Sequence, residues 1–464
     1  MDCVANLDCR VVPLGNAEPV VAVIGGGYAG MAAAVTLAEA GVKCVIFEAG
    51  KTLGGRARRV EYRDEVIDNG QHILAGAYTE LLRLMRLVGV SGSALKHVPL
   101  RLSMPPEFLL RVPQTVVLPG SLALAWAVLT AKGLTFPDRL AAIRFLLALK
   151  RMNYRVNSHQ TVAMLLAEQK QPQNLIDHLW QPLTISALNT PTSAASAQVF
   201  VNVLRDSIAS TRRASDLLLP CVDLTSLFPD PAAAWIGKRD GKVHTGVRIN
   251  EIRATEGRFA IAHDAATQHF DGVIIAVGPH QLEGLLSEVA IPSLRFEPIV
   301  TVYFKFDRTT RLPEAMLGQA RGVAHWFFDR RALGLPIGGG KPAHDGDGLI
   351  AAVISASGTH SLLSQDELAA QILDELKSHV PDLPSPLWVK VVTEKFATFA
   401  CTPDADRPTM NTLYPGVYLA GDYVAGDYPA TLEGAVRSGI AAAQASIAFF
   451  RPRLTKSFLA QETT

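Results

Sequence analysis

The sequence predicts an α/β protein of mixed α+β character, with a Rossmann-like parallel sheet in one domain and a mixed sheet plus apolar helices in a second. Three observations support this fold class. Residues 20–48 have the pattern of strand, glycine turn, helix and strand. Residues 76–220 are rich in apolar helical segments, and residues 417–443 form a strand followed by a small-residue helix. A chain of 464 residues is too long for one compact core, so two or three domains are expected.

The N-terminal segment has the spacing of a dinucleotide-binding motif. Val20–Ile24 is an apolar run typical of a strand buried on both faces, and Gly25, Gly27 and Gly30 follow it. We expect Gly25 to make the turn, Gly27 to let backbone approach a pyrophosphate, and Gly30 to let the helix pack on the strand. The next strand ends in Glu48, where an acid bonds both ribose hydroxyls and repels the 2′-phosphate of NADP.

Composition excludes some classes of partner. The net charge is +1 and no run of basic residues occurs, which argues against nucleic acid. Hydrophobic residues make up 48% of the chain, enough for a core and an apolar cavity. Residues 1–19 lack the pattern of a signal peptide and are expected to be a loose leader. No stretch of about 18 apolar residues predicts a membrane span.

The cysteines are odd in number and scattered, without C-x-x-C spacing. This pattern predicts reduced thiols in a cytoplasmic protein, and neither a disulfide framework nor a metal site. The five positions are Cys3, Cys9, Cys44, Cys221 and Cys401.

A second glycine turn follows the βαβ unit. Gly54, Gly55 and Arg56 offer a close backbone approach and a guanidinium able to bind a phosphate through two hydrogen bonds. A surface turn with a solvated arginine is the alternative, but the carboxyl edge of the sheet favours a functional role. Asp68 and His72 come next, and we expect them close to the middle of the cofactor. They are candidate catalytic groups, although an isolated pair of this kind is more often structural.

The region from 76 to 220 holds several apolar helices. Helices are predicted at residues 78–88, 119–130, 138–152, 161–169 and 175–188. Two interpretations of the most apolar of these, 119–130 and 138–152, stay open. They are core helices of a second domain, which is favoured, or they form the wall of a lipid-sized tunnel or a patch on a bilayer surface.

Strand patterns return after residue 240. Residues 241–252 and 258–263 alternate like antiparallel strands, and residues 271–277 have the pattern of a buried strand. Residues 298–307 are expected to begin a second sheet, which residues 349–355 and 388–393 join.

The C-terminal block distinguishes FAD from NAD. A strand at 417–420 leads into Gly421 and Asp422, and a loop with Thr431 precedes a helix that begins at about Leu432. Asp422 can bond a sugar-alcohol hydroxyl, and the helix N-terminus can stabilise negative charge on a reduced flavin. NAD needs neither feature, whereas FAD has a ribityl chain and a ring that becomes anionic on reduction.

These motifs resemble the FAD-dependent amine oxidase and phytoene desaturase superfamily over nearly the whole chain. Within it, three stretches resemble the hydroxysqualene dehydroxylases, the squalene-associated FAD-dependent desaturases of hopanoid pathways. They are DNGQHIL (68–74), TFACTPDADRP (398–408) and PATLEGA (429–435).

The resemblance implies an FAD-binding domain assembled from residues 1–75, 221–285 and 395–464, and a substrate-binding domain formed by 76–220 and 286–394. It implies that FAD is bound non-covalently. The residues expected to bind it are Gly25, Gly27, Tyr28, Ala29, Gly30, Glu48, Ala49, Gly54, Gly55, Arg56, Ala57, Gly70, Gln71, Val247, Gly421, Asp422, Thr431 and Leu432.

The reaction that the resemblance implies is reductive removal of the hydroxyl of hydroxysqualene, giving squalene. A general acid is expected, with His72 and Asp68 as candidates and Asp404 and Asp406 behind them. The implied partners are a hydrophobic triterpenoid, an external electron donor and the inner face of the cell membrane, touched from the cytoplasm. A carotenoid-type desaturase, a flavin amine oxidase and a non-catalytic flavoprotein scaffold are the alternatives. The amine oxidase is less favoured because the position of its usual lysine is aligned with Ile299, with Lys305 further along.

Overall fold

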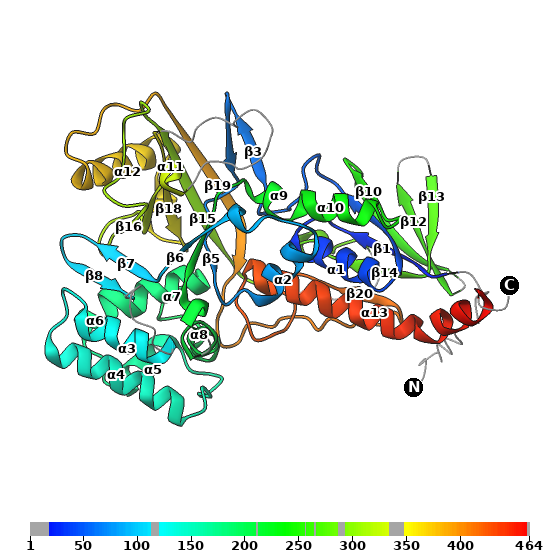
Figure 1. Ribbon diagram of the computed structural model, residues 1–464, viewed down its shortest axis with the longest axis horizontal. Helices are drawn as coiled ribbons and strands as arrows, with labels where there is room; N and C mark the ends of the chain where they lie inside the picture. Colours follow the sequence, from blue (N-terminus) through cyan, green and yellow to red (C-terminus); the bar gives the residue numbers. More distant parts are fainter. Residues whose placement is uncertain are drawn as a thin grey trace, which may run out of the picture.

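The computed structural model describes residues 18–112, 120–209, 212–255, 257–263, 266–285, 293–333 and 348–461 (Figure 1). One half of the molecule is built on a five-stranded parallel sheet that confirms the predicted α/β class. In spatial order its strands are β10 (Lys242–Thr245), β2 (Lys43–Glu48), β1 (Val20–Ile24), β14 (Gly272–Ile275) and β20 (Val417–Leu419). The sheet therefore combines segments almost 400 positions apart, all within the predicted FAD-binding segments.

Helices α1 (Tyr28–Glu39), α10 (Pro229–Gly237) and α13 (Leu432–Gln461) accompany this sheet in Figure 1, and α1 packs against both of the others. Small residues make the packing close. A Cβ atom at Gly439 of α13 would lie 2.1 Å from the carbonyl oxygen of Ala29 in α1. The N-terminal half of α13 is thereby fixed against the helix that follows the first glycine turn.

The prediction that residues 241–252 and 258–263 form antiparallel strands is only partly right. Lys242–Thr245 forms β10, which pairs in parallel with β2 at the edge of the main sheet. The antiparallel sheet contains β11 (Glu251–Thr255), β12 (Arg258–His263) and β13 (Ala266–Phe270). A half-exposed edge strand alternates in the same way as an antiparallel one, so the pattern did not separate the two.

The second large sheet is antiparallel and confirms the strands predicted at 298–307, 349–355 and 388–393. Its order is β16 (Met316–Gly318), β17 (Trp326–Asp329), β18 (Leu349–Ser355), β15 (Phe296–Lys305) and β19 (Trp388–Phe399). Helix α12 (Gln365–His379) buries Leu368, Ile372 and Leu376 in the core cluster of this sheet, and the short α11 (Arg330–Leu333) follows β17.

The second large sheet and a group of helices together form the second lobe of the molecule (Figure 1). The group contains α3 (Gly120–Thr130), α4 (Phe136–Arg151), α5 (Val162–Glu168), α6 (Gln173–Leu175), α7 (Gln181–Leu188) and α8 (Ala197–Leu204). A π-helical turn joins α6 to α7 within the single helix predicted at 175–188. Helix α2 (Thr79–Leu87) instead packs on α13.

Short elements connect the two lobes. They are the hairpin of β3 (Arg59–Tyr62) with β4 (Glu65–Asp68), the sheet of β5 (Leu74–Ala75), β9 (Leu217–Pro220) and β6 (Leu95–Val98), and helix α9 (Leu224–Leu227). The hairpin of β7 (Arg101–Met104) with β8 (Phe108–Arg111) lies in the second lobe, where β7 contacts β16 and β8 contacts α3. Strand β19 crosses the expected domain boundary at 394–395, and the division into domains stays a prediction.

Cys44, Cys221 and Cys401 are thiols that form no disulfide bond, while Cys3, Cys9 and the expected leader up to residue 17 lie outside the described residues. In the described part of the chain, no helix is both long and apolar enough to cross a membrane. The same residues contain no group of three or more His, Cys, Asp or Glu side chains arranged to hold a metal ion.

Candidate functional site

A cavity of about 720 Å³ lies between the parallel sheet and the second lobe. It collects residues from the first glycine turn, the second glycine turn, the 69–73 loop and the segment after β20. The predicted cofactor-binding residues that line it are Gly25, Gly27, Tyr28, Ala29, Glu48, Ala49, Gly54, Gly55, Arg56, Ala57, Gly70, Gln71, Val247, Gly421, Asp422, Thr431 and Leu432. His72 also lines the cavity, whereas Gly30, Asp68, Asp404 and Asp406 do not.

Close backbone contacts shape one end of the cavity. A Cβ atom at Gly25 would lie 2.6 Å from the carbonyl oxygen of Ala276, and one at Gly30 would lie 1.9 Å from that of Gly25. Gly27 and Gly55 bring two turns together, since a Cβ atom at Gly55 would be 3.2 Å from the Cα atom of Gly27. No side chain caps the N-terminus of α1, so its first N–H groups are available beside the cavity.

Glu48 is fixed at the end of β2 by two backbone donors. Its Oε2 accepts a hydrogen bond from the N–H of Gly26 at 2.7 Å, and its Oε1 accepts one from the N–H of Gly50 at 2.7 Å. The N–H of Val247 donates to the backbone carbonyl of Glu48 at 2.9 Å. Because an ionised carboxylate has about four lone-pair sites, two remain for hydroxyl groups of a ligand.

Arg56 ties the second glycine turn to two distant segments. Its Nη2 forms an ion pair with Oδ1 of Asp422 at 2.5 Å, and its Nη1 donates to the carbonyl of Ala397 at 2.7 Å. The carboxylate side chain is only 7% exposed. In the structure Arg56 therefore orients Asp422, a contact that the sequence prediction of a phosphate-binding arginine did not foresee.

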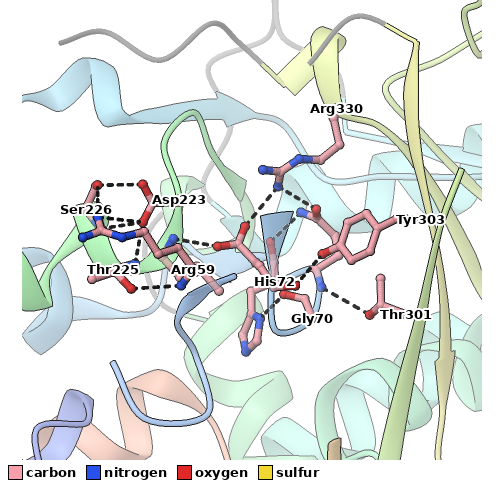
Figure 2. Close-up of polar contacts among 12 residues, drawn as sticks. Arg59, Gly70, His72, Asp223, Thr225, Ser226, Thr301, Tyr303 and Arg330 are labelled. Atoms are coloured by element: carbon pink, nitrogen blue, oxygen red, sulfur yellow. Dashed lines mark hydrogen bonds and ion pairs between the residues drawn. The ribbon is translucent and has the colours of Figure 1, made fainter. Parts of the chain in front are cut away.

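Asp68 lies behind the cavity wall and holds the loop that forms it. Its Oδ1 accepts from the N–H of Leu224 at 2.9 Å, and its Oδ2 pairs with Nη1 of Arg330 at 3.2 Å. Burial raises the pKa of Asp68 to about 6, with the neighbouring Arg330 acting in the opposite direction. The hydroxyl of Tyr303 donates to the backbone carbonyl of Asp68 at 3.0 Å (Figure 2). These contacts hold the carboxyl group of Asp68, which does not belong to the cavity lining.

His72 reaches the cavity from the same loop. Its Nδ1 lies 2.9 Å from the carbonyl oxygen of Gly70, so Nδ1 carries the proton there and Nε2 is the atom left for a ligand (Figure 2). Burial lowers the pKa of His72, and the charge of Arg56 lowers it further. Arg330 donates to the side-chain oxygen of Gln71 at 2.9 Å, which links the loop to the Asp68 ion pair.

The other end of the cavity is apolar. Side chains of β7 and the residue before it, of α7 and of the second sheet line it, namely Leu100, Leu102, Leu183, Ile185, Ile299, Met316, Trp326, Phe328 and Val353. The helices α3 and α4 contribute no lining residue, so the tunnel-wall interpretation of those two segments does not describe this cavity. They bury one face in the core instead, as the favoured interpretation expects.

Sequence reasoning missed several lining residues, among them Arg58, Arg248, His280, Glu394 and Tyr423. Residues 276–278 follow β14, so the rule that ligands bind at the carboxyl ends of parallel strands identifies this neighbourhood. Glu394 comes from β19, and no local pattern connects that strand to the glycine turns.

A family model described as flavin containing amine oxidoreductase matches residues 28–447. The chain belongs to this family. It is an FAD-dependent oxidoreductase, as its relatives also indicate.

Curated relatives resemble the chain over most of its length. Proteins named hydroxysqualene dehydroxylase from Zymomonas mobilis and Rhodopseudomonas palustris are each 29% identical, with 92% of this chain and 98% of each relative covered. A 15-cis-phytoene desaturase of Glycine max is 23% identical, with 92% of this chain and 79% of the relative covered.

Solved structures share the fold. An oxidoreductase from Methanosarcina mazei superposes with a TM-score of 0.68 at 17% identity, covering 92% of this chain and all of that one. Cyclohexylamine oxidase from Brevibacterium oxydans gives 0.65 at 17% identity, covering 94% and 100%. At this identity the likeness concerns the fold alone.

The cavity of this family member fits FAD. An uncapped helix N-terminus and two glycine turns stand at one end, where a pyrophosphate needs N–H groups and close backbone. Asp422 and the N-terminus of α13 stand in another part, where Thr431 caps the helix by accepting from the N–H of Gly434 at 3.0 Å. The volume lies in the range of roughly 300–1,000 Å³ usual for ligand sites.

Arg407 organises the loop that carries Asp422. Its guanidinium donates to five backbone carbonyls of that loop and stacks over Phe399 at 4.6 Å. The carbonyls belong to Asp422, Tyr423, Val424, Gly426 and Tyr428. Burial lowers the pKa of Arg407, which is the cost of holding a cation among neutral acceptors.

We expect Arg407→Lys to lower the flavin content of the purified protein and to destabilise it by about 2–4 kcal/mol. A single ammonium group has three donors and lacks the planar fork that reaches five carbonyls. The measurements are the ratio of flavin to protein absorbance and the thermal unfolding midpoint. Arg239→Lys is the control, because Arg239 is exposed and stacks on Trp235 outside the cavity. Wild-type flavin content and midpoint in Arg407→Lys would contradict the positioning role.

Proposed function

We propose that the protein removes the hydroxyl group of hydroxysqualene reductively and releases squalene. The observation that carries the proposal is the set of full-length relatives named hydroxysqualene dehydroxylase, at 26–29% identity over 92% of this chain. The apolar end of the cavity supports it, because a long hydrocarbon needs a wall of side chains such as Leu102, Ile185 and Phe328.

In the proposal FAD is bound non-covalently: Glu48 would hold the adenosine ribose, and the N-terminus of α1 would hold the pyrophosphate. The second glycine turn and Val247 close this end. Asp422, oriented by Arg56, would hold the ribityl chain, and the N-terminus of α13 would stabilise negative charge on the reduced ring. FAD supplies the hydride for the reaction when it is bound in its reduced form.

The proposed reaction balances with one hydride and one proton. The C–O bond breaks, a C–H bond forms at the same carbon, and the hydroxyl leaves as water. The protein must protonate the departing oxygen, and His72 is the candidate because its Nε2 is the free nitrogen of a ring that lines the cavity. Asp68 takes the positioning role, since its carboxyl group lies outside the cavity lining.

A pH profile tests the role of His72. Its pKa is lowered, so the protonated form exists mainly below the ordinary histidine pKa of about 6.5, and kcat/KM should rise as the pH falls through that region. We expect His72→Gln to lose this dependence and roughly 10²–10⁴-fold in rate. His280→Gln is the matched control, because His280 also lines the cavity but stacks on Phe396. If the pH profile of kcat/KM is unchanged in His72→Gln, another group protonates the departing oxygen.

Product analysis tests the reaction itself. Dithionite-reduced protein is incubated with hydroxysqualene without oxygen, and the extracted lipid is analysed by mass spectrometry. The proposal expects squalene from reduced protein and unchanged substrate from oxidised protein. Recovery of unreacted hydroxysqualene from the fully reduced protein would overturn it.

A desaturase is the second candidate, since relatives named phytoene desaturase match at 23–24% identity. It predicts loss of hydrogen from an isoprenoid by the oxidised protein, which the same assay detects with phytoene. An amine oxidase is less well supported. Ile299 lines the cavity where a lysine would be expected, and Lys305 forms an ion pair with Glu65 outside the lining.

The proposal requires two partners. Reduced FAD must be regenerated by an external electron donor, because the sequence shows no second dinucleotide motif. A triterpenoid is a membrane component, so the protein is proposed to work in the cytoplasm against the inner face of the cell membrane.

A further inference from the structure

Helices α3 and α4 carry large apolar side chains that are exposed to solvent and lie outside the core. Six of the thirteen exposed large apolar side chains in the described part of the chain lie on these two helices. On α3 they are Leu122, Trp126 and Leu129, and on α4 they are Phe136, Leu140 and Leu147. Phe136 is 72% exposed and Trp126 is 50% exposed. We call these six residues the apolar face.

The apolar face is continuous along each helix. Spacings of four and three residues on α3, and of four and seven residues on α4, place the three side chains of each helix on one side. The opposite sides are buried, with Ala127 and Val128 of α3 and Ala142 and Phe145 of α4 fully enclosed in the core. Each helix therefore has two apolar sides, and one of them faces solvent.

Basic side chains accompany the apolar face. Residues 120–151 contain five Lys or Arg residues and one acidic residue, Asp138. Asp138 is 5% exposed and accepts hydrogen bonds from the N–H of Thr135 and the side chain of Asn174, so it adds little negative charge to the surface. The exposed cations are Lys132, Arg144, Lys150 and Arg151. Arg144 and Arg151 share the exposed side of α4 with Phe136, Leu140 and Leu147 by spacing.

We infer that the apolar face docks on a bilayer that contains anionic lipid. Trp, Phe and Leu beside Lys and Arg are the residues of interfacial helices, where apolar side chains enter the headgroup boundary and cations remain with the phosphates. The surplus of positive charge favours an anionic lipid surface as the partner. A second copy of the chain is less favoured because its apolar face would carry the same positive charge. The chain as a whole is almost neutral, at +1, so this local surplus stands out.

The location suits delivery of a hydrocarbon. Helix α3 contacts β8, and β8 pairs with β7, whose Leu102 lines the apolar end of the cavity. In Figure 1 α3 and α4 lie in the lobe away from the parallel sheet. Docking through them leaves the parallel sheet and its glycine turns in the lobe that faces away from the bilayer. The inference rests on the proposed function in one respect: a membrane-dissolved substrate explains why the protein would bind a bilayer.

Vesicle sedimentation tests the inference with the full-length holoprotein and without substrate. Wild type is expected to sediment with phosphatidylcholine vesicles that contain phosphatidylglycerol, and much less with phosphatidylcholine alone. Trp126→Gln/Phe136→Ser should weaken binding at least tenfold, because two large apolar side chains no longer enter the bilayer. Leu362→Gln/Leu413→Ser is the matched control, since those side chains are 88% and 76% exposed elsewhere.

Charge reversal provides the second comparison. Lys150→Glu/Arg151→Glu should reduce binding to anionic vesicles roughly 30-fold or more, while Lys238→Glu/Lys242→Glu makes the same charge change on the other lobe and should have little effect. Wild type that stays in the supernatant, or equal losses in patch and control variants, would overturn the inference. A dimer that Trp126→Gln/Phe136→Ser dissociates, without vesicle binding, would also overturn it in favour of a second copy.

The outcome is separable from the proposed reaction. The apolar face lies outside the cavity, so its variants should still convert detergent-dispersed substrate. Vesicle binding without dehydroxylation would remove the proposed function alone, and dehydroxylation without vesicle binding would remove the docking surface alone.

Discussion

Gly30→Val is expected to abolish the folded flavoprotein. Even a Cβ atom at this position would lie 1.9 Å from the carbonyl oxygen of Gly25 and 3.2 Å from the Cβ atom of Ala276. Both neighbours belong to the strand ends that form the cavity, so relief of the clash must move α1 away from the sheet. We expect a loss of about 4 kcal/mol or more, seen as insoluble protein or a strongly lowered thermal midpoint.

Gly237→Ala is the control for this prediction. Gly237 ends α10, and nothing lies within 4 Å of a Cβ atom placed there. Alanine in that helix should leave stability unchanged or slightly raised. A soluble, yellow Gly30→Val protein with a wild-type midpoint would show that α1 and β1 are not packed as described.

Glu48→Gln is expected to weaken FAD binding by roughly 30- to 1,000-fold. The amide keeps the shape of the carboxylate but turns one acceptor into a donor that faces an N–H group of Gly26 or Gly50. Two charge-assisted hydrogen bonds to the turn are thereby reduced to one neutral bond, and an acceptor for ribose is lost. A loss of about 2–4 kcal/mol corresponds to that range.

The test is a fluorescence titration of the apoprotein with FAD. Glu18→Gln removes the same charge from an exposed ion pair with Lys43 near the start of β1, and it should bind FAD as wild type does. If Glu48→Gln and Glu18→Gln bind with equal affinity, Glu48 does not hold the ribose.

The βαβ unit could be predicted from sequence because its determinants are local. Strand β1, the glycine turn and β2 lie within thirty residues, and their order defines the site of the pyrophosphate. The strand and helix around Asp422 were predictable for the same reason. Their meeting at one cavity followed only from the resemblance, since no local pattern joins residues about 400 positions apart.

The contacts that tune the site were not predictable in this way. Arg56 pairs with Asp422 across 366 positions, and Asp68 is fixed by Leu224 and Arg330 at separations of 156 and 262 positions. The sequence motifs placed Arg56 and Asp68 near the cavity correctly, but they did not identify the residues that these two side chains contact. Strand β10 was predicted wrongly for a related reason. Its local alternation indicated an antiparallel strand, but its parallel pairing with β2 depends on the whole sheet.

The most direct test is an anaerobic single turnover that counts electrons and product together. Protein carrying one reduced flavin per chain is mixed with hydroxysqualene while flavin absorbance is recorded, and squalene is measured at the end. We expect the oxidised flavin spectrum to return and one squalene to form for each flavin oxidised. A flavin that stays reduced in the presence of excess hydroxysqualene, or one that reoxidises without squalene, would contradict it.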